Sequence, residues 1–207
     1  IVELLGMQDK IPVVKGAAEP LVHELLPGRT KNPKTAEIQY DENGEEGCYH
    51  PKKFNLPEPT TKPVDENFVT WYINTIKNSP EKVTIVPVGP LTDIAILLRA
   101  EPSIVDNIEE IVIMGGGHEQ RNSTAAAEFN IWKDPEAAEI VMNCGAKITL
   151  VPLDATHAAS TRLSEVQQYK DLHTPVGDMI AELIEIRTRA YNILQPLHEP
   201  DLCPIHD

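Results

Sequence analysis

Three short apolar runs, each with a helix-like pattern nearby, constrain the fold of this chain more than any other feature. The runs are residues 83–88, 111–114 and 148–153. Helical spacing covers 91–100, and a second helix is expected between Asp134-Pro135, which suit a helix start, and Gly145. Strands that are apolar throughout are typical of buried parallel sheets. The sequence therefore predicts an α/β fold with a Rossmann-like, open, mostly parallel sheet flanked by helices.

Four further segments have recognisable patterns. Residues 68–76 have the spacing of an amphipathic helix, and a longer helix is expected over 176–191. Ser164 to Gln167 have the spacing of a capping box at a helix start. Residues 11–14 are a candidate short strand. These elements extend the α/β pattern towards both ends of the chain.

The stretch from Pro27 to Pro63 is polar, rich in proline and weakly periodic. It is expected to be a long loop, with a turn at Asn43-Gly44. The first residues, Ile1 to Gly6, resemble the last turn of a helix that Gly6 ends. We expect one domain over residues 1–207, truncated at both ends.

Composition narrows the class of partner. The 207 residues fit one α/β domain, and 41% of them are hydrophobic. A formal net charge of -14 disfavours nucleic acid and anionic membranes, and favours a neutral or cationic small molecule. The three cysteines are odd in number and lack CxxC spacing, which predicts a reducing, cytoplasmic location. Neither a membrane-length apolar run nor a signal peptide is recognised.

A polar segment follows the second apolar run, where ligands bind in open parallel sheets. It begins with Gly115-Gly116-Gly117 and carries Asn122, Glu128 and Asn130. In extended backbone, Glu128 and Asn130 would point to one side, as a hydroxyl-rich ligand such as a sugar requires. The alternative is a glycine turn followed by a solvated loop. The pattern GxGxxG is absent, which argues against a dinucleotide-binding protein.

Several motifs follow one another in a characteristic order. They are Val86–Ala95, Ile113–Gly116 followed by Asn122, Ala127–Asn130, Asp134–Ala138, Leu153–His157 and the terminal His206-Asp207. In this order they resemble the inosine-uridine preferring nucleoside hydrolase family. The match is close from about Lys82 to His157 and looser outside it. The resemblance implies a nucleoside hydrolase-like fold and hydrolysis of ribonucleosides to free base and ribose.

The resemblance also implies roles in ribose binding. The residues matching Asn122 and Glu128 hold the ribose 5′-hydroxyl, and the residue matching Asn130 holds the 2′ side. Met114 matches a residue that lines the ribose pocket. All four lie in or beside the polar segment that the strand pattern singles out.

Metal and acid roles are implied for three more residues. A bound Ca²⁺ is held in this family by a backbone carbonyl matching that of Val88 and by a carboxylate matching Asp207, both oxygen ligands. His206 matches the histidine that is credited with protonating the leaving purine base. Without the resemblance, a lone His206 is more often structural. His198, Cys203 and His206 match no established zinc spacing.

The chain departs from the family pattern in two places. The segment Asp-x-Asp-Pro-Gly-x-Asp-Asp, which supplies most calcium carboxylates and the general base, is absent from these residues. Residues 40–47 replace a His-Gly-containing segment beside the base site, so base preference does not carry over. An inactive nucleoside- or ribose-binding relative is therefore the alternative function. Family membership further implies nucleoside salvage and a homo-oligomer, dimeric or tetrameric.

Overall fold

The computed structural model describes residues 1–22, 40, 43–44, 47–49 and 55–206, which fall into two compact units. The first unit comprises residues 1–12, 34–62 and 157–205, and the second comprises 13–33, 63–156 and 206–207. Each unit has its own cluster of buried apolar side chains. Most of the sequence expectations about ligand binding fall in the second unit.

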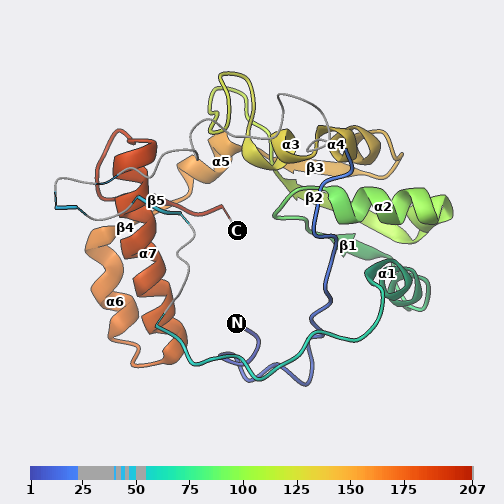
Figure 1. Ribbon diagram of the computed structural model, residues 1–207, viewed down its shortest axis with the longest axis horizontal. Coiled ribbons are helices and arrows are strands. Elements are labelled where there is room, and N and C mark those ends of the chain that lie inside the picture. Colours follow the sequence, from blue (N-terminus) through green and yellow to red (C-terminus); the bar gives the residue numbers. More distant parts are fainter. Residues whose placement is uncertain (23–39, 41–42, 45–46, 50–54, 207) are drawn as a thin grey trace. The chain divides into compact units, whose positions relative to one another are not determined.

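The second unit contains a three-stranded parallel sheet (Figure 1). Its strands are β1 (Val83–Ile85), β2 (Ile108–Met114) and β3 (Ile148–Val151), in the spatial order β1-β2-β3. Ile111 pairs with Ile148 and Met114 with Val151, so the two longer strands end at the same level. This confirms the predicted parallel α/β arrangement.

Among the described residues of the second unit, five helical segments accompany this sheet. They are α1 (Phe68–Lys77), α2 (Thr92–Ala100), η3 (Pro102–Asn107), α3 (Phe129–Lys133) and α4 (Pro135–Met142). The chain steps from β1 through α2 to β2 and from β2 through α4 to β3, always in one direction across the sheet. Right-handed connections of this kind place α2 and α4 side by side on the same face, as Figure 1 shows.

The core of the second unit lies between β2 and these helices. Ile111 and Ile113 are fully buried and pack with Leu97 of α2 and Val141 of α4. Each such side chain contributes about 1.5–3 kcal/mol through burial. The middle strand is therefore buried as predicted, whereas Leu150 of β3 is 43% exposed.

The first unit is built around one long helix, α7 (Pro175–Leu194), whose N-cap is Thr174. It packs against α6 (Val166–Lys170) and β5 (Leu202–Pro204). The described part of this unit also contains η4 (Leu163–Glu165) and β4 (Ser160–Arg162), which pairs antiparallel with β5. Helix α5 (Leu153–Ala158) contains residues of both units. Although α7 has 20 residues, no helix in the described part of the chain qualifies as a membrane span.

Several expected boundaries differ in the structure. The first strand ends at Ile85, because Pro87 has no N–H to continue the ladder. The third ends at Val151, because Pro152 begins the turn into α5, so Leu153 is helical rather than extended. The expected strand 11–14 is wrong: only Val14 forms a bridge, with Val64.

Two local predictions near chain turns have different outcomes. The capping box at Ser164–Gln167 is wrong, since Glu165 accepts from the Arg162 N–H at 3.0 Å and α6 begins only at Val166. The turn at Asn43-Gly44 is present, with Gly44 at φ 80°. Much of the expected loop 27–63 lies outside the described residues.

Candidate functional site

The carboxyl ends of the three parallel strands are joined by backbone hydrogen bonds. The Met114 N–H donates to the Pro87 carbonyl at 3.0 Å, and the Gly115 N–H donates to Val151 at 3.1 Å. The Leu153 N–H donates to the Gly116 carbonyl at 2.9 Å. The segments after each strand are thus fixed to one another, which makes this edge a rigid base for polar side chains.

Asn130 lies at this edge with its side chain buried, 7% of its surface being exposed. Its Nδ2 donates to the Met114 carbonyl at 3.0 Å and lies 3.3 Å from the Val88 carbonyl. Because both carbonyl oxygens can only accept, the NH₂ of the amide must face them. A ligand would therefore meet the amide through Oδ1, an acceptor suited to a sugar hydroxyl.

Glu128 is the N-cap of α3 and is 3% exposed. Its carboxylate accepts from the N–H of Gly116 at 3.0 Å, of Asn130 at 2.9 Å and of Ile131 at 3.3 Å. The expectation of extended backbone through Asn130 is wrong, because Asn130 already lies in the first turn of α3. The two side chains are brought together by the helix start, where a carboxylate is favoured by the exposed N–H groups.

Asn122 is held beside this helix start. Its Oδ1 accepts from the Phe129 N–H at 2.8 Å, next to Glu128 in sequence. The loop between them is closed by the Ser123 N–H, which donates to Ala127 at 3.1 Å. Asn122, Glu128 and Asn130 therefore belong to one hydrogen-bonded arrangement around the start of α3.

Asp154, to which the sequence assigned no role, organises the glycine segment. Its carboxylate accepts from three consecutive N–H groups, of His118, Glu119 and Gln120, at 2.7–3.1 Å. These bonds lower the pKa of Asp154 from 3.8 to about 2. A Cβ added at Gly117 would overlap the Gln120 carbonyl oxygen, so the turn requires glycine there. The sequence could have singled out Asp154, because it comes directly after the third apolar run, where ligand-binding residues are expected.

The lowered pKa of Asp154 predicts a pH-dependent loop. Because the pKa is depressed in the folded protein, the stabilisation is complete above 3.8 and is lost as the pH falls towards 2. We expect the amide resonances of Glu119 and Gln120 to move towards random-coil values over this range in NMR spectra. In Asp154→Asn the resonances of the loop amides should already be shifted at neutral pH. Unchanged resonances in this variant would show that the Asp154 carboxylate does not hold the loop.

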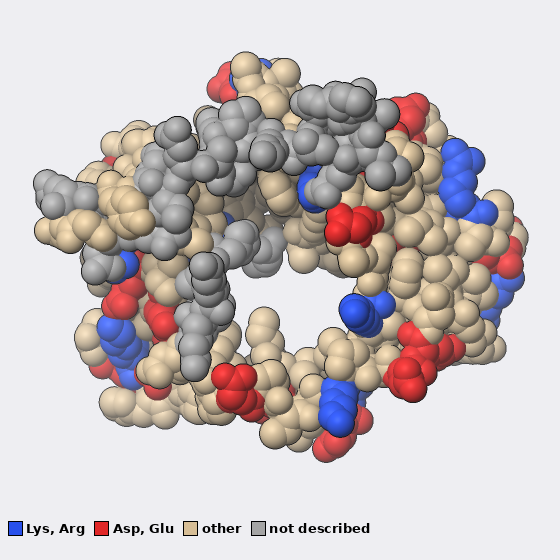
Figure 2. Space-filling model, viewed as in Figure 1, with Lys and Arg blue, Asp and Glu red and all other residues tan. Residues whose placement is uncertain are grey.

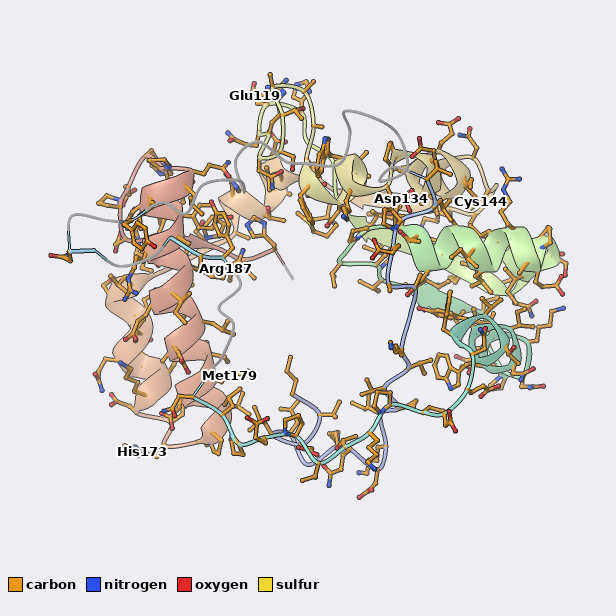
Figure 3. The ribbon with its side chains drawn as sticks, viewed as in Figure 1. Glu119, Asp134, Cys144, His173, Met179 and Arg187 are labelled. Atoms are coloured by element: carbon orange, nitrogen blue, oxygen red, sulfur yellow. The ribbon has the colours of Figure 1, made fainter. Side chains whose placement is uncertain are left out.

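Asp134 and Asp93 attach the segment 13–22 to the sheet unit. Asp134 is fully buried and accepts from the Leu21 N–H at 2.9 Å, the Thr92 hydroxyl at 2.6 Å and the Ala137 N–H at 3.0 Å. Figure 3 shows it at the start of α4, beside α2. Asp93 accepts from the Ala17 N–H at 2.8 Å. The sequence predicted Asp134 as an N-cap but not its partners in α2 and the N-terminal segment.

His206 lies against α5. Its Nδ1 is 2.8 Å from the Thr156 hydroxyl oxygen, which in turn donates to the Leu153 carbonyl at 3.0 Å. All three residues belong to the second unit. The sequence did not predict this contact, because Thr156 and His206 are 50 positions apart.

The two predicted metal ligands are oxygen donors, which suit a hard cation, but two ligands are too few to hold Ca²⁺. The carbonyl of Val88, a residue 48% exposed, is an oxygen donor at the carboxyl edge of the sheet, while Asp207 lies outside the described residues. Ca²⁺ takes about six to eight oxygen ligands. Within the described residues no three His, Cys, Asp or Glu side chains gather as a metal site, so the His198–Cys203–His206 zinc hypothesis has no support.

Surface charge is distributed without a dominant sign on the face drawn in Figure 2. There, basic and acidic side chains of the described residues lie in small groups among uncharged ones. The whole sequence nevertheless has an excess of acidic residues, 32 against 18 basic.

Comparisons with known proteins agree on one family. A model described as inosine-uridine preferring nucleoside hydrolase matches residues 1–207. The pyrimidine-specific ribonucleoside hydrolase RihA of Shigella boydii serotype 4 is 37% identical over 203 residues, covering 95% of this chain and 60% of that protein. RihA of Escherichia coli K12 gives the same values. The chain thus spans about 60% of the length of these relatives.

Solved structures give the same result. A purine-preferring ribonucleoside hydrolase from Gardnerella vaginalis matches with a TM-score of 0.78 and 30% identity, over 100% of this chain and 61% of that one. A plant nucleoside hydrolase, the PpNRh1 enzyme, matches with a TM-score of 0.74 and 27% identity, over 99% and 60%. With a parallel sheet that carries the family's motifs at its carboxyl edge, this chain belongs to the inosine-uridine preferring nucleoside hydrolase family.

Proposed function

We propose that the complete protein hydrolyses the N-glycosidic bond of ribonucleosides, releasing free base and ribose. The observation that carries this proposal is the buried pair Glu128 and Asn130, held at the carboxyl edge of the sheet beside Met114. Both present acceptor oxygens in a place where parallel sheets bind ligands. Ribose hydroxyls are donors of the matching kind. Asn122, Glu128 and Asn130, with Met114 beside them, are the proposed ribose-binding residues.

In the proposed reaction, the ribose-binding residues and His206 act on the charges that develop on the sugar and on the departing base. Breaking the bond between C1′ and the base develops positive charge on the sugar. The Glu128 carboxylate stabilises that charge electrostatically, while hydrogen bonds from ribose to Asn122 and Asn130 fix the ring. His206 donates a proton to the departing base, which leaves as a neutral molecule.

Calcium is the proposed cofactor. The Val88 carbonyl and the Asp207 carboxylate would hold it, together with ligands beyond those that the described residues supply. When bound, such an ion lowers the pKa of a water molecule and orients it for attack. The oxygen chemistry of the two donors supports calcium over softer metals.

The base, the assembly and the location are further proposals. The names of similar proteins include pyrimidine-specific and purine-preferring hydrolases, so both nucleoside classes are candidate substrates. From the family resemblance we infer one hydrolase domain over residues 1–207, a homodimer or homotetramer, a cytoplasmic location and a role in nucleoside salvage. The net charge of -14 supports a nucleoside rather than nucleic acid or a membrane as the partner.

The test is turnover by the complete protein. Uridine and inosine are incubated with enzyme and Ca²⁺, and ribose release is followed by a reducing-sugar assay. We expect turnover of at least one nucleoside, loss of turnover on chelation with EGTA, and recovery when Ca²⁺ is restored.

The alternative function predicts a different result in the same experiment. An inactive relative would bind ribose or a nucleoside in calorimetry without releasing product from either substrate. Binding without turnover would therefore replace the hydrolase by a nucleoside-binding protein. Absence of both binding and turnover would contradict both functions.

A further inference from the structure

The hydroxyl of Thr156 makes two short contacts but has a single hydrogen. Its Oγ1 lies 3.0 Å from the Leu153 carbonyl oxygen and 2.8 Å from Nδ1 of His206. The Leu153 carbonyl can only accept, so the hydroxyl hydrogen must point to it for that contact to be attractive. The second contact is then attractive only if Nδ1 of His206 carries a hydrogen and donates it.

The surroundings of Thr156 favour this arrangement. Thr156 is 3% exposed and lies in α5, and its own N–H donates to the Pro152 carbonyl at 3.2 Å. If the hydroxyl turned to donate to His206, its oxygen and the Leu153 carbonyl oxygen would face each other without a hydrogen between them. Two buried oxygen atoms that face each other without a hydrogen destabilise the folded protein.

We propose that Thr156 is a positioning residue for acid catalysis by His206, holding the imidazole in the form that carries hydrogen on Nδ1. This inference rests on the proposed function. With Nδ1 committed to Thr156 in both the neutral and the protonated ring, Nε2 is the nitrogen that exchanges a proton. As the C1′–N bond breaks, its electron pair moves to the base. Nε2 gives its proton to the base and keeps the former N–H electron pair.

This role makes a specific kinetic prediction for two substrates. A nucleoside needs a proton on its departing base, whereas p-nitrophenyl β-D-ribofuranoside releases an anion that is stable without one. In Thr156→Val of the complete protein, kcat for uridine or inosine should fall by about 100-fold, within the range of acid–base contributions. KM should change little, and kcat for p-nitrophenyl riboside should stay within about threefold, since its departure needs no acid.

Thr156→Ser is the matched control, because serine keeps the hydroxyl and loses only a methyl group. It should recover kcat for the nucleoside to within about tenfold of the parent protein. Equal losses for the nucleoside and p-nitrophenyl riboside in Thr156→Val would mean a merely structural role. An unchanged kcat for the nucleoside in Thr156→Val would also overturn the proposal.

A spectroscopic measurement separates failure of this inference from failure of the proposed function. In protein labelled with ¹⁵N-histidine, one of the seven histidines is assigned to His206 by its loss in His206→Gln. Its ¹⁵N shifts should show hydrogen on Nδ1 in the neutral ring, and Thr156→Val should shift the population towards the other tautomer. Hydrogen on Nε2 in the parent protein would refute the inference. Lack of turnover of both substrates would refute the hydrolase function while this measurement still tests Thr156.

Discussion

Replacing Asp134 by alanine is expected to lower the free energy of unfolding by about 3–5 kcal/mol. The substitution removes the N-cap of α4 and leaves the Thr92 hydroxyl and the Leu21 N–H without their acceptor. The carboxylate is fully buried, so water does not readily replace it in the intact structure. Urea denaturation followed by circular dichroism measures the change.

Glu139→Ala is the matched control for Asp134→Ala. Glu139 lies on the exposed side of the same helix, and its removal should change stability by less than about 0.5 kcal/mol. A double-mutant cycle with Thr92→Val should show coupling of about 0.5–3 kcal/mol, because the two side chains share one hydrogen bond. Equal, small effects of Asp134→Ala and Glu139→Ala would show that the buried contacts contribute little.

Asn130→Ala should lower kcat/KM of the complete protein for its nucleoside by about 100-fold, which corresponds to about 2.7 kcal/mol of transition-state stabilisation. The substitution removes the proposed acceptor for the 2′ side of ribose. It also removes the NH₂ that donates to the Met114 carbonyl and lies close to that of Val88. Steady-state kinetics with uridine and inosine measure the effect on catalysis.

Because Asn130 also joins two strand ends, its replacement should cost about 1–3 kcal/mol of stability without unfolding the protein. Asn143→Ala is the control, since Asn143 is exposed at the end of α4 and its amide donates to the backbone carbonyl and the side chain of Glu139. The Asn143→Ala variant should leave kcat and KM unchanged. If Asn130→Ala also left kcat and KM unchanged, Asn130 would not belong to the proposed ribose site.

The sequence predicted the order of strands and helices well because that order depends on local patterns. Ile111 and Ile113 lie in a strand buried against helices, as their apolar run indicated. Asp134 and Pro135 start a helix, as their capping chemistry required. The predicted ends of two strands were wrong because proline lacks the N–H that strand pairing needs. Pro87 and Pro152 follow the strand ends, although the apolar pattern continues past them.

Contacts between distant residues could not be predicted in this way. The grouping of Glu128 and Asn130 was expected from their alternation, and that of Asn122 with them from the family resemblance. Its geometry depends on a helix start at Glu128 that the residue pattern did not indicate. Nothing local identifies Thr156 as the partner of His206, or Leu21 as a partner of Asp134. Such pairs depend on how the sheet places segments in space.

The attachment of segment 13–22 by two carboxylates has a consequence for the order of folding. The Ala17–Asp93 bond joins residues 76 positions apart, and the Leu21–Asp134 bond joins residues 113 apart. Closing such long loops is entropically costly until their far ends are already fixed. The starts of α2 and α4, which present the two acceptors, must therefore form first. The N-terminal segment is expected to dock late, onto a sheet that has already assembled without it.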